Sequence, residues 1–128
     1  MRPLLLLPVL LAACVAEEPP TGAMSFAENC VSCHGTGGAG DGPLAAGLDP
    51  RPADLTSLSR RHGGTFPMQY VLGVIDGYRR ETPFPTAMPE FGAGDLGPTV
   101  VVEFEEGIGT PVPERLLELA RYIRTLQD

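Results

Sequence analysis

Apolar residues recur at helical spacing near the beginning of the chain, in the segment 21–29. Gly22, Phe26 and Cys30 lie four positions apart, so they share one face of a helix. Thr21 precedes them and has the kind of hydroxyl side chain that commonly caps a helix N-terminus. The pattern therefore predicts a short helix over this segment.

Two later segments show the same periodicity. The run 66–77 places apolar residues on one face and ends at an Asp-Gly pair, which is a typical C-terminal stop. The clearest stripe begins at Pro111 or Pro113 and continues to about Leu126. Its apolar positions are Leu116, Leu119, Ala120, Ile123 and Leu126, with Tyr122 alongside. We therefore expect a helix in each of these segments.

The remaining segments are predicted to be mostly loop. A glycine-rich turn spans 34–42, where small residues would let the backbone approach a bound group closely. A proline-containing loop follows over 43–58, with one helical turn near 53–58, and another loop spans 83–94. The segment 100–105, Val-Val-Val-Glu-Phe-Glu, is β-prone and predicts a strand or a short hairpin.

Composition limits how much core such a chain can bury. Of 128 residues, 16 are Gly and 14 are Pro, while aromatic residues make up 6% and Trp is absent. A chain of this length forms a single domain, and one so rich in loops has a modest core. Domains of this kind usually need a disulfide, a metal or a buried cofactor for stability.

The charge balance narrows the choice of partners. The chain carries 16 acidic residues against 9 basic ones, all of them arginine, and its net charge is −7. This acidity argues against binding to nucleic acid and against electrostatic attachment to anionic lipid. It is compatible with docking to a basic patch on a protein partner.

The segment 1–13 reads as an export signal. Arg2 and the amino terminus supply positive charge, and the apolar run that follows is far too short to span a bilayer. The run ends in Leu-Ala-Ala-Cys14, which resembles the lipobox of bacterial lipoproteins, whose cysteine is acylated and begins the mature protein. In an ordinary signal peptide, cleaved near Ala16, Cys14 would be lost instead.

The leader predicts a periplasmic protein tethered to a bacterial membrane. We expect a signal peptide over 1–13, a short tether over 14–21 and a single domain over 22–128. Acyl chains on Cys14 would hold this domain at a membrane surface, because each buried methylene contributes about 0.8 kcal/mol.

The motif Cys30-Val-Ser-Cys33-His34 carries the main chemical signal. C-x-x-C-H is typical of c-type haem attachment. The two thiols are spaced to reach both vinyl groups on one edge of a porphyrin, and His34 follows directly as the proximal ligand of the iron. We predict one covalent haem c, which would stabilise a small exported domain without a large core.

Three other interpretations of the cysteine pair fit less well. A thioredoxin-like redox pair would need a preceding strand and a longer α/β chain. A zinc site would need a second pair of Cys or His residues at ligand spacing. A disulfide across two residues would be strained and would leave His34 without a role.

The sixth coordination position of the iron needs a ligand from elsewhere in the chain. Met88 is the best candidate, because its proline-flanked loop can bring a thioether over the distal face. Met68 falls on a predicted helix and is more typical of a core filler. Met24 lies too close to the attachment motif, and His62 lies in a polar segment. An empty position is the remaining alternative.

In their order along the chain, these pieces resemble the class I cytochromes c of bacterial periplasms over about residues 22–126. The likeness rests on the haem motif, the Met88-Pro89 loop, the Pro-Arg-Pro-Ala-Asp-Leu stretch and the closing helix 119–126. It implies an all-α fold of three to five helices around one haem, and we allow for a short β-hairpin insertion near 96–112. It also implies that the first and last helices touch. Their contact would involve Gly22, Phe26 and Tyr122.

The resemblance also implies residues that support the cofactor. A proline carbonyl should accept a hydrogen bond from the proximal imidazole and so fix the ring. We assign this role to Pro43, with Pro50 and Pro52 as alternatives. Arg79 and Arg80 precede the methionine loop and could neutralise the haem propionates, since Arg pairs carboxylates in bidentate fashion. The equal alternative is a solvent-exposed pair.

These expectations combine into a periplasmic electron carrier that is not itself an enzyme. It would shuttle single electrons between respiratory or other redox proteins, as a monomer or as a subunit. Two rivals remain: a cytochrome subunit docked in a larger oxidoreductase, and a haem-based gas binder or sensor with an open sixth position. The acidic insertion 96–112 could be a docking element for a partner or a solvated loop.

Overall fold

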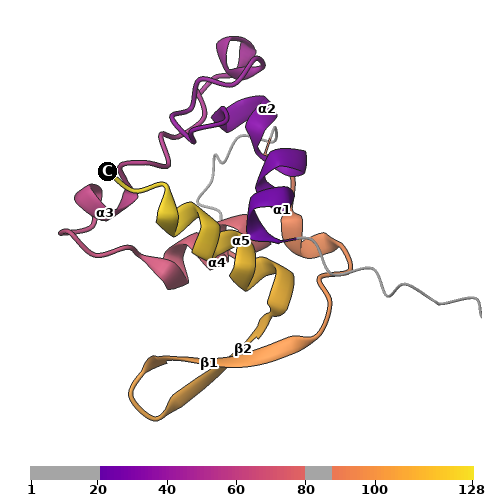
Figure 1. Cartoon of the computed structure of the whole chain (residues 1–128), viewed down its shortest axis with the longest axis vertical. Coiled ribbons are helices and arrows are strands. Elements are labelled where there is room, and N and C mark those ends of the chain that lie inside the picture. The colour runs from indigo at the N-terminus through magenta and orange to yellow at the C-terminus, as the bar shows by residue number, and fades with distance from the viewer. Residues whose placement is uncertain (1–20, 80–87) are drawn as a thin grey trace, which may run out of the picture.

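The computed structural model describes residues 21–79 and 88–128 of the chain (Figure 1). The expected signal segment 1–13, Cys14 with most of the tether, and Arg80 lie outside these ranges. Within the described ranges, no helix is long and apolar enough to cross a membrane.

These residues form a mostly helical domain with one small sheet. The α-helices are α1 (Gly22–Asn29), α2 (Val31–His34), α3 (Leu58–Arg61), α4 (Met68–Asp76) and α5 (Glu114–Thr125). The other elements are the 3-10 turns η1 (Ala45–Gly47) and η2 (Phe91–Ala93) and the strands β1 (Thr99–Glu105) and β2 (Ile108–Pro113). The arrangement is compatible with the mostly α-helical fold that the sequence predicted, and it includes the hairpin allowed for near 96–112.

Local sequence accounts for the ends of three helices. Thr21 caps α1, and its hydroxyl accepts a hydrogen bond from the N–H of Met24 at 3.4 Å. α4 ends at Gly77, which adopts a left-handed conformation with a φ of 96°. α5 begins directly after Pro113, whereas Pro111 lies within β2 and therefore does not open the helix.

One predicted turn lies later than expected. The helical turn placed near 53–58 is α3, which begins only at Leu58. The reason is Asp54, whose carboxylate accepts hydrogen bonds from the backbone N–H and the hydroxyl of Thr56, at 2.9 and 2.7 Å. Such side-chain bonds compete with helix formation. The residues just before Leu58 are therefore not helical.

The core lies where α5 packs against α1 and α4 (Figure 1). Its largest fully buried side chains are Phe26, Leu119 and Ile123. Gly22 brings α1 against α5, because a Cβ at this position would overlap the backbone carbonyl of Glu118. The rings of Phe26 and Tyr122 pack beside it with their centroids 5.3 Å apart. The contact predicted for these residues is confirmed.

The β1–β2 hairpin extends away from the helices (Figure 1). Its strands pair antiparallel, with Val100 opposite Val112 and Glu103 opposite Gly109. Successive side chains of β1 face opposite sides of the sheet. The inward-facing ones, which pack against the core, are Val100, Val102 and Phe104. The exposed ones are Thr99, Val101, Glu103 and Glu105.

Candidate functional site

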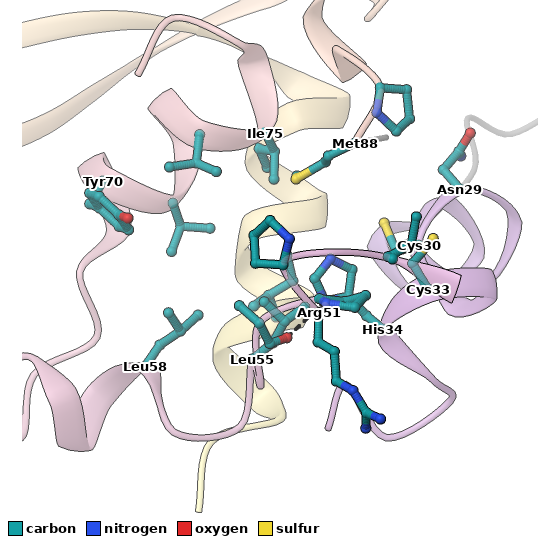
Figure 2. Close-up of a pocket in the computed structure, with 18 of the residues that line it drawn as sticks. Asn29, Cys30, Cys33, His34, Arg51, Leu55, Leu58, Tyr70, Ile75 and Met88 are labelled. Carbon is teal, nitrogen blue, oxygen red and sulfur yellow. Dashed lines mark hydrogen bonds between the residues drawn. The ribbon is translucent and has the colours of Figure 1, made fainter. Parts of the chain in front are cut away.

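A cavity of about 430 Å³ lies between the α1–α2 junction, the loop before α3, and α4. Figure 2 shows Cys30 and Cys33 at one end of it, next to His34, and Tyr70 at the other. The first group of lining residues is Asn29, Cys30, Cys33 and His34. The segment 48–62 contributes a second group, and α4 contributes Tyr70, Val71, Val74 and Ile75. Met88, Pro89 and Ile123 complete the wall.

The junction of α1 and α2 holds the two cysteines three positions apart, around one helical turn. Cys30 caps the C-terminal end of α1, where its N–H donates to the Phe26 carbonyl. The same residue also immediately precedes α2. Its carbonyl then accepts hydrogen bonds from the N–H groups of Cys33 and His34, at 3.2 and 2.8 Å. The local helix therefore presents both thiols and the imidazole to one end of the cavity. Both thiols are free and half-buried.

Burial keeps the Cys30 thiol protonated. Burial, together with the smaller effect of the Cys33 charge, raises the pKa of Cys30 to about 11. At neutral pH the Cys30 sulfur therefore carries its hydrogen.

His34 is oriented by a hydrogen bond to a residue that the sequence did not single out. Its Nδ1 lies 2.9 Å from the carbonyl oxygen of Ala53. A carbonyl can only accept, so Nδ1 carries the hydrogen and the lone pair of Nε2 is available for a ligand. Burial lowers the pKa of His34, and the bond to Ala53 partly opposes that effect. The imidazole is therefore favoured in its neutral form.

The assignment of Pro43 as this acceptor is wrong, and neither Pro50 nor Pro52 accepts the bond. The residue after Pro43 is held against α2, where the Leu44 N–H donates to the carbonyl of Ser32 at 2.9 Å. Pro43 is exposed and does not line the cavity. The chain reverses direction after Pro43 and reaches the imidazole of His34 only at Ala53.

The glycine-rich turn 34–42 allows the later loop to pass close to the attachment motif. Gly40 has a φ of 80°, and a Cβ on it would lie 2.5 Å from the Pro52 carbonyl oxygen. Gly42 lies equally close to α2, since its Cβ would be 2.5 Å from the carbonyl oxygen of Ser32. None of these glycines lines the cavity. The small size of Gly40 and Gly42 therefore serves the contact of two backbone segments.

Two of the candidates for the sixth ligand, Met88 and His62, line the cavity. Met88 is half-buried, lines the cavity and packs against the core. Met68 packs against the core without lining the cavity, and Met24 is 52% exposed on α1. His62 does line the cavity, where its Nδ1 lies 2.8 Å from the Leu58 carbonyl oxygen.

Two arginines lie on the described part of the cavity wall, and Arg79 fits the alternative of a solvent-exposed side chain. Arg51 and Arg61 line the cavity, whereas Arg79 is exposed elsewhere and packs its stem against Gly73. Arg80 lies outside the described residues. Arg61 is steadied by a hydrogen bond of 2.8 Å from its Nη2 to the Asp54 carbonyl. Arg51 belongs to the Pro-Arg-Pro stretch on which the family resemblance partly rests, so the sequence did contain a signal for this residue.

The residues present fit a haem. The volume lies within the range of about 300–1,000 Å³ that is usual for cofactor sites. The lining combines a thiol pair and an available imidazole nitrogen with a thioether and two guanidinium groups. Within the described ranges, no group of three or more His, Cys, Asp or Glu side chains could hold a metal ion directly, as a zinc site would require.

Comparison with known families agrees with this geometry. A family model described as cytochrome c oxidase, cbb3-type, subunit III matches residues 17–103, which is more than half of the chain. A domain of this family binds haem c covalently and takes part in electron transfer. The chain has no significant match among curated proteins or solved structures.

Proposed function

Because the chain belongs to this cytochrome c family, we propose that it holds one haem c on Cys30, Cys33 and His34 and transfers single electrons. The observation that carries the proposal is that these three residues meet at one end of a cavity of cofactor size. Bound there, the haem supplies a one-electron couple between ferric and ferrous iron. The rest of the site positions and shields it.

Each residue of the motif has a distinct role in this proposal. Cys30 and Cys33 would form the thioether bonds, and their spacing around one helical turn sets the haem edge to which they attach. His34 offers Nε2 to the iron, while the bond from its Nδ1 to Ala53 fixes the tautomer and the ring orientation.

Met88 is the proposed sixth ligand. A thioether in this position raises the reduction potential and closes the site to gases, which suits an electron carrier. Its half-buried place on the cavity wall supports this role over that of Met68 or Met24. We assign the neutralisation of the haem propionates to Arg51 and Arg61, because among the described residues these are the arginines on the cavity wall.

Location and anchoring follow from the leader. Cytochrome c domains are typically extracytoplasmic, and the lipobox-like Leu-Ala-Ala-Cys14 supports acylation of Cys14. The domain would then work as a tethered electron carrier in the periplasm and would make no bond in a substrate itself. Mass spectrometry of the mature protein tests the anchor, because an acyl mass on Cys14 should disappear in Cys14→Ser.

A second candidate is a subunit of a terminal oxidase, and the description of the matching family favours it. The hairpin is a suitable contact, since Val101 and Ile108 are 75% and 56% exposed next to acidic side chains. Purification of a tagged chain from membranes distinguishes the two. A stoichiometric oxidase complex that Val101→Asp disrupts would support the subunit, whereas weak, salt-sensitive association would support the free carrier.

The central test is a pair of visible spectra, oxidised and reduced, from protein made in a host with periplasmic haem-attachment machinery. We expect a c-type spectrum with the weak long-wavelength band of sulfur ligation to ferric iron. Met88→Ala should abolish that band, and Met68→Ala should keep it, because Met68 does not line the cavity.

The alternative outcomes are equally informative. A c-type spectrum without the band, and with a shift on adding carbon monoxide, would favour the gas binder. A protein without haem would contradict the proposal and return Cys30 and Cys33 to thiol chemistry.

A further inference from the structure

We propose that Gln127 is a positioning residue for the haem site. It clamps the segment whose carbonyl orients His34, and it does so from beyond the end of α5. The inference rests on the proposed function, because it takes His34 to be an iron ligand.

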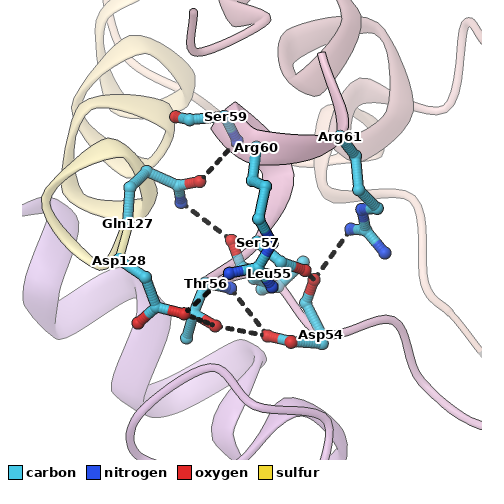
Figure 3. A network of polar contacts seen from close by, with 9 residues as sticks. All are labelled: Asp54, Leu55, Thr56, Ser57, Ser59, Arg60, Arg61, Gln127 and Asp128. Atoms are coloured by element: carbon cyan, nitrogen blue, oxygen red, sulfur yellow. Dashed lines mark hydrogen bonds and ion pairs between the residues drawn. The ribbon is translucent and has the colours of Figure 1, made fainter. Parts of the chain in front are cut away.

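The side-chain amide of Gln127 makes three hydrogen bonds, of which Figure 3 shows the two to Leu55 and Ser59. Its Nε2 donates to the Leu55 carbonyl at 2.7 Å and to the Ile123 carbonyl at 2.9 Å. Its Oε1 accepts from the N–H of Ser59 at 2.8 Å. The group is partly buried, so these bonds replace water and fix the amide in one orientation.

Two of the three bonds hold the segment that runs from Ala53 into α3. Leu55 is held on both sides, because its N–H also donates to the Gly38 carbonyl at 2.7 Å. Asp128 adds a backbone bond of 3.1 Å to the Thr56 carbonyl. Ala53 lies two residues before Leu55. Fixing Leu55 therefore leaves the carbonyl of Ala53 little freedom to turn away from His34.

This segment depends on such bonds because it has no regular structure of its own. The residues between η1 and α3 form no helix or strand. Their backbone is therefore held by bonds to neighbouring elements, such as Gly38 and Gln127. An amide suits the position because it both donates and accepts, whereas a carboxylate only accepts.

The consequence for the site concerns the basicity of the proximal ligand. A hydrogen bond from the second nitrogen raises the basicity of a ligating imidazole, which favours ferric over ferrous iron. If the Ala53 carbonyl is less well held, the bond weakens and the reduction potential rises. Loss of the clamp should also let the His34 ring proton exchange faster with solvent.

The test uses the intact haem protein and the variant Gln127→Met, which keeps length and neutrality but lacks these bonds. We expect a twofold to tenfold shift of the ferric–ferrous equilibrium toward ferrous, where tenfold corresponds to about 59 mV. We also expect exchange of the His34 Nδ1 proton, followed by NMR in the ferrous state, to accelerate about tenfold.

Two controls separate positioning from general stability. Thr125→Ala removes a bond that stays within α5, from the Thr125 hydroxyl to the Tyr122 carbonyl. Leu116→Val lowers stability from a buried core position that does not line the cavity. Both should leave the potential and the His34 proton unchanged.

The proposal fails if Gln127→Met changes neither the potential nor the exchange rate more than Leu116→Val does. If Gln127→Met does not fold, Gln127→Glu replaces it, since it keeps the acceptor for Ser59 and lacks the donor for Leu55. The same faster exchange is expected there. Failure of the proposed function is seen earlier and separately, as a wild-type protein without covalent haem.

Discussion

The Nδ1 atom of His34 lies 2.9 Å from the carbonyl oxygen of Ala53, nineteen positions further along the chain. This contact joins the attachment motif to the loop before α3. It selects the tautomer in which Nε2 is available, and it depends on the close return of the loop past Gly40.

Gly40→Ala should disturb this contact. The residue has a φ of 80°, and the added Cβ would lie 2.5 Å from the Pro52 carbonyl oxygen, so the loop must move away from the turn. We expect a loss of about 1–3 kcal/mol in unfolding free energy and faster exchange of the His34 ring proton. Urea unfolding and NMR measure the two effects.

Gly63→Ala is the matched control for that experiment, because Gly63 has a φ of 70° and no atom lies within 4 Å of its Cβ position. Equal losses in Gly63→Ala and Gly40→Ala would mean that the contact with Pro52 is unimportant.

Gly22→Ala should lower stability although alanine is the better helix former. The Cβ would overlap the Glu118 carbonyl and push α1 away from α5. The expected loss is about 1–3 kcal/mol, which outweighs the helix propensity gain of about 1 kcal/mol. Thermal unfolding measures it, with Gly47→Ala as the control because its Cβ position is open. A stabilised Gly22→Ala protein would contradict the observed helix contact.

Arg51→Gln and Arg61→Gln should each lower the reduction potential. Both arginines line the cavity, and loss of a positive charge there favours the more positively charged ferric state. The shift should stay within about tenfold, or about 59 mV, and shrink as salt rises. Arg79→Gln, which is exposed and outside the cavity wall, should have a smaller effect. A larger effect of Arg79→Gln would favour Arg79 as the partner of the propionates.

Asp54 should make the domain less stable in acid. The hydroxyl of Thr56 lowers the pKa of Asp54 below its ordinary 3.8, with help from the Thr56 N–H and the charge of Arg61, although burial opposes them. Because the folded pKa is the lower one, the stabilisation is present above pH 4 and is lost as the pH falls through the folded value.

Asp54→Asn tests this dependence. Between pH 7 and pH 3, the wild type should lose more unfolding free energy than Asp54→Asn, as followed by urea titrations at each pH. Asp49→Asn, at an exposed aspartate, provides the control. Parallel pH curves for wild type and Asp54→Asn would contradict the prediction.

The sequence by itself determined the features that depend on neighbouring positions. Cys30, Cys33 and His34 are nearly adjacent, so one helical turn suffices to bring them together whatever the rest of the chain does. The apolar stripe of α5 and its partners Gly22 and Phe26 were equally readable, because helical periodicity puts them on faces that must be buried.

Only the tertiary structure decided what surrounds that motif. Ala53 rather than Pro43 orients the imidazole, and Arg51 rather than Arg79 lines the cavity. Gln127 holds the carbonyl of Leu55 across 72 positions of sequence. The physical reason is that the course of a loop depends on many weak contacts between distant segments. Nothing in the sequence around a backbone carbonyl or a side-chain amide indicates which distant group it will bind by a hydrogen bond.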